Sequence, residues 1–163
     1  LHDIGKVAVP DAVLLKPGKW DEDEFAEMRR HPIAGDRILS VLPGLRDAAD
    51  IARSHHERWD GKGYPYGVSG DAIPLEGRIC AIADAFDAMI TKRSYKSAMP
   101  VEKALEILLQ DAGSHFDPEL AQLFVAMKRN GIGYKALTNP TSSSKIPQRV
   151  HGQVVRPPAP SQG

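Results

Sequence analysis

The segment between positions 57 and 77 constrains the fold more than any other part of the chain. It holds five glycines together with Pro65 and Pro74, a density that excludes a helix or a long strand. Long segments without secondary structure in compact domains are usually functional. We therefore expect a long Gly/Pro-rich loop that serves a site, with the fold supplied by the chain on either side of it.

The flanking sequence has the apolar spacing of helices and no strand pattern, so the predicted fold class is all-α. Asp21 and Glu24 stand at the two positions of a capping box, which marks a helix start. The strongest pattern covers 75–91, and it predicts burial of Ile79, Ile82, Ala83, Phe86, Met89 and Ile90. Further helices are expected at 22–30, 33–41, 45–55, 101–111 and from 117 onward.

We expect one domain at 1–130 and a disordered tail at 131–163. The tail is rich in Pro, Ser, Thr and Gln and poor in large apolar residues. The chain begins with Leu1 and a His-Asp pair follows at once, so we expect a fragment whose upstream helices are missing. Residues 1–9 are expected to be the end of a helix that Gly5 terminates.

The composition excludes several classes of protein. Lys+Arg and Asp+Glu both number 21, and this balance argues against a generic nucleic-acid or membrane-surface binder. Cys80 is the single cysteine, so no internal disulfide can form, which fits the reducing cytoplasm. No apolar run approaches the ~20 residues of a membrane span.

Histidines and acids gather in motifs spread along the chain. Each residue alone has an ordinary interpretation as a helix cap, a surface histidine or a buried ion pair. Together they offer the ligand types of a two-metal hydrolytic site, in which a carboxylate bridges two cations and neighbouring imidazoles serve different ones. The residues are His2, Asp3, His31, His55, His56, Asp84 and Asp87.

Three cations accompany these motifs. Arg93 and Lys96 follow the helix expected at 75–91, where positive charge also suits the helix dipole. The alternative interpretation is that they contact phosphate groups beside the metals, and Lys6 could do the same.

The motifs His2-Asp3-Ile4-Gly5-Lys6, His31-Pro32, HHERWDGKGYP at 55–65 and Asp84-Ala85-Phe86-Asp87 resemble the HD-GYP subfamily of HD-domain phosphohydrolases. The resemblance covers roughly residues 1–128. It implies an HD-domain-like helical bundle around two or three divalent metal ions, iron or manganese. It also implies hydrolysis of the bacterial second messenger cyclic di-GMP to pGpG or GMP.

The resemblance also assigns roles by position. His2, Asp3, His31, His55, His56 and Asp84 match metal ligands, with Asp3 as the bridge. Lys6, Asp87, Arg93 and Lys96 match residues near the substrate, and Asp3, Lys6 and Asp87 are the candidate catalytic residues. Gly63, Tyr64 and Pro65 match the signature loop, which is thought to contact diguanylate cyclase (GGDEF) domains.

One departure concerns the upstream side. The family takes a further Glu and His ligand from a helix before the His-Asp pair, and this sequence does not contain that helix. Family members often carry a sensor or receiver domain before it. Two alternatives to a cyclic di-GMP phosphodiesterase stay open: a docking module that is catalytically incomplete, and a phosphohydrolase for another nucleotide.

Overall fold

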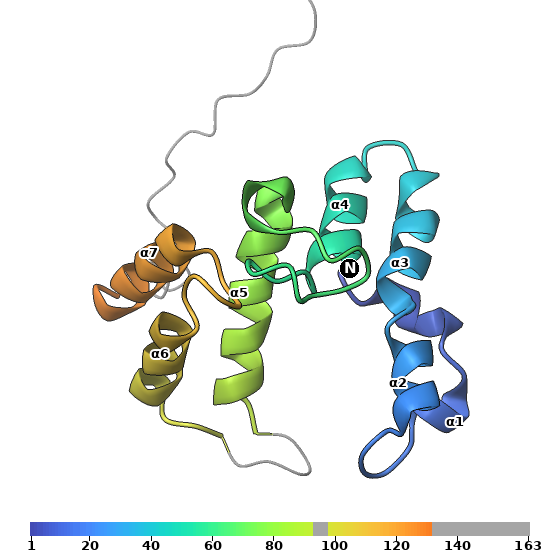
Figure 1. Cartoon of the computed structure of the whole chain (residues 1–163), viewed down its shortest axis with the longest axis horizontal. Coiled ribbons are helices and arrows are strands. Elements are labelled where there is room, and N and C mark those ends of the chain that lie inside the picture. The colour runs from blue at the N-terminus through green and yellow to red at the C-terminus, as the bar shows by residue number, and fades with distance from the viewer. Residues whose placement is uncertain (93–97, 132–163) are drawn as a thin grey trace, which may run out of the picture.

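A computed structural model describes residues 1–92 and 98–131, and every regular element within them is helical (Figure 1). The prediction of an all-α fold is therefore confirmed. The elements are η1 (Ile4–Ala8), α1 (Asp11–Leu14), α2 (Glu22–Met28), α3 (His31–Ser40), α4 (Arg46–Ser54), η2 (Gly70–Ala72), α5 (Leu75–Ile90), α6 (Val101–Gln110) and α7 (Pro118–Arg129).

Several predictions fall on other residues. The tail at 132–163 lies outside the described residues, and so do Arg93 and Lys96. Among the described helices, none combines the length and the apolar character needed to cross a membrane.

The capping box at the start of α2 is present as expected. The Asp21 carboxylate accepts a hydrogen bond from Glu24 N at 2.9 Å, and the Glu24 carboxylate accepts one from Asp21 N at 2.9 Å. The end of α2 differs from expectation, because the helix stops at Met28 and α3 already begins at His31. Pro32 belongs to the first turn of α3, where a missing backbone N–H costs nothing.

Helix α5 stands between α4 on one side and α6 and α7 on the other (Figure 1). On the side of α6 and α7, Ile82 and Phe86 pack into a core with Leu105, Leu108 and Val125. Ile79, however, is 50% exposed, and Ala83 is also exposed, so their predicted burial is wrong. The neighbouring helices cover a narrower stripe of α5 than its apolar sequence suggests.

Gly5 does not end a helix. It is buried within η1, at the place where η1 crosses α3. A Cβ atom on Gly5 would lie 1.9 Å from the carbonyl oxygen of His31 and 2.4 Å from the backbone nitrogen of Gly35. Only a residue without a side chain allows this approach of the two backbones.

We expect the substitution Gly5→Ala to push η1 away from α3 and to lower the free energy of unfolding by about 3 kcal/mol. Urea denaturation measures this loss. Gly18→Ala is the control, since its Cβ would meet nothing within 4 Å and only its positive φ of 114° opposes the change, a cost of about 1 kcal/mol. An equal loss in the two variants would contradict the close-packing explanation.

Candidate metal centre

Four side chains from the ends of three helices meet at one point. Donor atoms of Asp3, His31, His55 and His56 all lie within 4.8 Å of one another. Asp3 is the N-cap of η1, His31 is the first residue of α3, and His55 is the C-cap of α4 with His56 next to it. The centre is thus built from helix ends, and the packing of η1 and α4 against α3 brings these ends together.

Backbone carbonyls orient two of the imidazoles. His31 Nδ1 lies 2.7 Å from the carbonyl oxygen of Met28, and His55 Nδ1 lies 3.0 Å from that of Ala52. A carbonyl can only accept, so Nδ1 carries the proton in each ring and Nε2 keeps a free lone pair. Metal-binding histidines are typically held in this way.

The two free Nε2 atoms face each other and the same carboxylate oxygen. They are 3.4 Å apart, and Asp3 Oδ1 lies 3.4 Å from the one on His31 and 3.7 Å from the one on His55. With the protons on Nδ1, three lone-pair donors converge with no proton between them. A cation relieves this repulsion, and imidazole with carboxylate is a suitable ligand set for divalent transition metals. The residues therefore fit a divalent metal ion.

The second oxygen of Asp3 faces a different group of residues. Asp3 Oδ2 lies 3.6 Å from His2 Nε2, which in turn is 3.8 Å from Asp84 Oδ1 on α5. The Lys6 ammonium donates a hydrogen bond to the same Asp3 oxygen at 2.5 Å. The Asp3 carboxylate thus lies between two sets of possible ligands, as a bridging ligand does.

The surroundings of Asp3 and His56 shift the pKa values of both side chains. Burial raises the pKa of Asp3, but the Lys6 ammonium, which donates a hydrogen bond to the carboxylate and places a positive charge beside it, lowers the pKa, and the net pKa stays well below its ordinary value. Burial lowers the pKa of His56 to about 3. The carboxylate is therefore ionised and the His56 imidazole neutral at neutral pH, the protonation states that metal binding requires.

The structure brings together most of the residues that the sequence singles out. His2, Asp3, Lys6, His31, His55, His56 and Asp84 gather at the centre. Asp84 is only partly buried, with 41% of its side chain exposed, because it faces His2 rather than an apolar core. Asp87 is exposed one turn further along α5, and its carboxylate accepts a hydrogen bond from the Thr91 hydroxyl.

The long loop contacts the centre through Tyr64. The Tyr64 ring stacks on the His56 ring, with centroids 4.7 Å apart and an angle of 22° between the planes. The preceding residue, Gly63, lies against the backbone of the same loop, since a Cβ on Gly63 would be 2.4 Å from Arg58 N. Pro65 follows. Glycine at position 63 thus lets the loop fold back against 57–58 and bring Tyr64 onto the histidine.

Glu57 holds this loop in place, a role that the sequence interpretation did not assign. It is 2% exposed, and its Oε1 accepts a hydrogen bond from Tyr66 N at 2.7 Å. Backbone hydrogen bonds from Trp59 and Asp60 to the carbonyls of His115 and Ser114 tie the loop to the connection between α6 and α7. The only sequence signal for Glu57 is an acid directly after the histidine pair.

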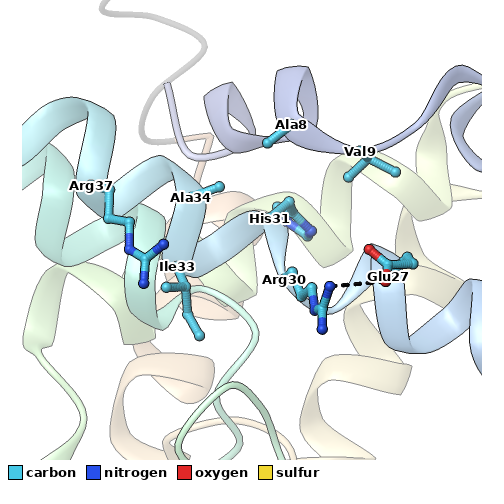
Figure 2. Close-up of a pocket in the computed structure, with 8 residues that line it drawn as sticks. All are labelled: Ala8, Val9, Glu27, Arg30, His31, Ile33, Ala34 and Arg37. Carbon is cyan, nitrogen blue, oxygen red and sulfur yellow. Dashed lines mark hydrogen bonds and ion pairs between the residues drawn. The ribbon is translucent and has the colours of Figure 1, made fainter.

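A cavity of about 420 Å³ lies beside His31 between η1, α2 and α3 (Figure 2). Arg30 and Arg37 border it, and Arg30 pairs with Glu27 at 2.9 Å. Of the four clustered ligands only His31 lines this cavity. The cavity is therefore separate from the point where the donor atoms of Asp3, His31, His55 and His56 meet.

Comparison with known proteins gives the family. The family model described as the HD domain matches residues 1–120. The chain belongs to the HD-domain family. The boundary predicted at residue 130 stays a prediction, since the match ends earlier.

Relatives of this HD domain confirm the assignment to the HD-GYP subfamily. A cyclic di-GMP phosphodiesterase response regulator of Xanthomonas campestris is 52% identical over 120 residues, which are 72% of this chain and 32% of the relative. A 3′3′-cGAMP-specific phosphodiesterase of Vibrio cholerae is 50% identical over 127 residues, 77% of this chain and 24% of that protein.

The fold is found in a solved structure as well. The crystal structure of a cyclic GMP-AMP-specific phosphodiesterase of Vibrio cholerae matches 83% of the HD domain chain and 35% of its own, with a TM-score of 0.61 and 22% identity. This similarity concerns the fold alone. The chain spans between 24% and 36% of the length of the curated relatives that it matches.

We expect His31→Gln to lower the metal content of the HD domain severely, because it removes a nitrogen ligand whose orientation α2 fixes. Elemental analysis after anaerobic loading with Mn²⁺ or Fe²⁺ measures the ions bound per chain. His115→Gln is the matched control, since His115 is partly buried but lies outside the cluster. Equal metal content in the wild type and the His31 variant would contradict this ligand assignment.

We expect Glu57→Ala to release the loop, because Tyr66 N–H loses its acceptor. The free energy of unfolding should fall by about 1–3 kcal/mol. Hydrogen exchange at the Tyr66 amide should also become faster. Glu57→Gln keeps an oxygen acceptor and serves as the control. Unchanged exchange in the alanine variant would show that the loop is held by other contacts.

Proposed function

We propose that this chain is the catalytic domain of a divalent-metal-dependent phosphodiesterase that hydrolyses cyclic di-GMP to pGpG or onward to GMP. The convergence of the Nε2 atoms of His31 and His55 on the Asp3 carboxylate carries the proposal. The names of several relatives support the reaction class, since they are cyclic di-GMP or cGAMP phosphodiesterases.

The proposed site holds two metal ions, iron or manganese, with Asp3 between them. His31, His55 and His56 would serve one side of the Asp3 carboxylate, and His2 and Asp84 the other. A third ion would need ligands beyond these, such as the upstream Glu and His that the family uses.

Bound divalent ions would lower the pKa of a coordinated water to about 7 and neutralise phosphate oxygens. In this proposal Asp3 orients the water for in-line attack, and Lys6, already beside Asp3, contacts a phosphate oxygen. Asp87 or another acid, in its protonated form, would give a proton to the leaving 3′ oxygen. Arg93 and Lys96, which lie outside the described residues, contact the phosphate groups or guanines of the substrate.

A second candidate substrate is 3′3′-cGAMP. Relatives named for it are 37–50% identical to this chain, and relatives named for cyclic di-GMP are 42–52% identical. Both substrates are cyclic dinucleotides with two phosphodiester bonds, and they differ in one base. The shared phosphodiester explains why one metal centre could serve either.

The surroundings of the enzyme are part of the proposal. We infer that it acts in the cytoplasm, under the control of an upstream sensor or receiver domain, and that the Gly63-Tyr64-Pro65 segment contacts diguanylate cyclase domains. Tyr64 and Pro65 are only partly buried, which leaves surface for such a contact. A domain that acts only by docking would show this contact without hydrolysis.

The test is metal content and hydrolysis in the natural protein, purified anaerobically. We expect two or more ions per chain and turnover of cyclic di-GMP, and we expect Asp3→Ala to lower kcat/KM on the order of 1,000-fold. Asp47→Ala, an exposed acid on α4, is the control. Retained metal and wild-type rates in the Asp3 variant would refute the mechanism. Metal binding without hydrolysis of either dinucleotide would refute the substrate assignment.

A further inference from the structure

Arg29 lies in the short connection between α2 and α3 and contacts two aromatic rings. Its Cζ is 4.5 Å from the centroid of the Phe25 ring and 5.2 Å from that of the Tyr64 ring. The Tyr64 ring in turn stacks on His56, a member of the metal cluster. Arg29 is therefore separated from the centre by one aromatic side chain.

The guanidinium of Arg29 has no acceptor among residues 1–92 and 98–131, and the same is true of Arg37 and Arg46, whereas several other arginines of this part of the chain are paired. Arg30 is paired with Glu27, Arg58 with Asp60, and Arg78 with Asp71 and Asp117. Arg29 is nevertheless exposed and held by contact with aromatic rings. A guanidinium that is held by aromatic rings and has no acceptor keeps its N–H groups for a ligand.

We propose that Arg29 binds the cyclic dinucleotide through a pair of acceptor atoms outside the phosphodiester that is cleaved. This proposal rests on the proposed function, and it names a substrate contact that the metal ligands do not provide. Two groups of cyclic di-GMP offer suitable acceptor pairs: the second phosphate, and the O6 and N7 atoms of guanine. Both match the planar fork of an arginine.

The position of Arg29 favours this role. The preceding residue, Met28, supplies the carbonyl that orients His31, so Arg29 extends from a backbone segment that is fixed relative to the centre. The contacts with the rings of Phe25 and Tyr64 restrict the side chain before the ligand binds, which lowers the entropy lost on binding. A mobile surface arginine would lack this advantage.

Steady-state kinetics of the metal-loaded natural protein test the proposal. We expect Arg29→Gln to raise KM for cyclic di-GMP about 10-fold or more, as for a lost charge-assisted hydrogen-bond pair. Metal content and kcat should stay near those of the wild type. Arg29→Lys should restore little, because an ammonium lacks the planar fork. Arg30→Gln, which removes the adjacent positive charge, is the matched control.

Smaller and altered substrates identify the contact. Hydrolysis of bis(p-nitrophenyl) phosphate, which has neither a base nor a second phosphate, should be unaffected by Arg29→Gln. A comparison with cyclic di-AMP separates the two acceptor pairs: an equal KM penalty for both dinucleotides assigns the second phosphate, and a larger penalty for cyclic di-GMP assigns guanine. Either result supports the proposal.

Three results would overturn it. An unchanged KM in Arg29→Gln would show that Arg29 does not contact the substrate. Loss of metal or of kcat toward both substrate types would make Arg29 a positioning residue for Tyr64 and His56. If the wild type hydrolyses no cyclic dinucleotide, the proposed function fails, and equilibrium binding of cyclic di-GMP then decides separately: equal affinity in wild type and Arg29→Gln, or no binding by either, refutes the Arg29 contact.

Discussion

The approach of η1 to α3 at Gly5 is the constraint on which the metal centre depends. The backbone of Gly5 lies against the His31 carbonyl, and this places Asp3, two residues earlier, beside the His31 imidazole. His55 reaches the same point because α4 packs on α3 at Gly35, which lies close to both Ala52 of α4 and Gly5 of η1. One short helix, α3, thus determines the positions of a carboxylate and two imidazoles.

Helix ends serve two purposes in this centre. The last carbonyls of an α-helix have no partner within the helix. Those of Met28 at the end of α2 and Ala52 in the last turn of α4 accept the Nδ1 protons of His31 and His55. The same hydrogen bonds therefore satisfy buried carbonyls and direct two Nε2 lone pairs toward Asp3, so the orientation of the ligands follows from how the helices terminate.

The helices and the ligand motifs could be predicted from the sequence, whereas the contacts between distant segments could not. The capping box at Asp21, the ends of α5 near 75–91 and the histidine motifs are local patterns, and the structure contains them. The sequence predicts that Gly5 ends a helix, which is wrong. Glycine is needed at this position because the backbone of α3, 26 or more positions later in the sequence, lies against it. The contact of Arg29 with Tyr64 likewise joins segments that no periodicity relates.

The charge balance of the centre is compatible with the anionic substrate that we propose for a chain of zero net charge. The whole sequence has no excess of basic residues, so its net charge does not attract phosphate groups. At the centre, however, His56 is neutral and two carboxylates, Asp3 and Asp84, are the only anions named as ligands. Two divalent cations would keep an excess of positive charge there. Their field, with Lys6 and Arg29 beside it, would act over a few ångströms and favour a small dianionic dinucleotide over a long polyanion.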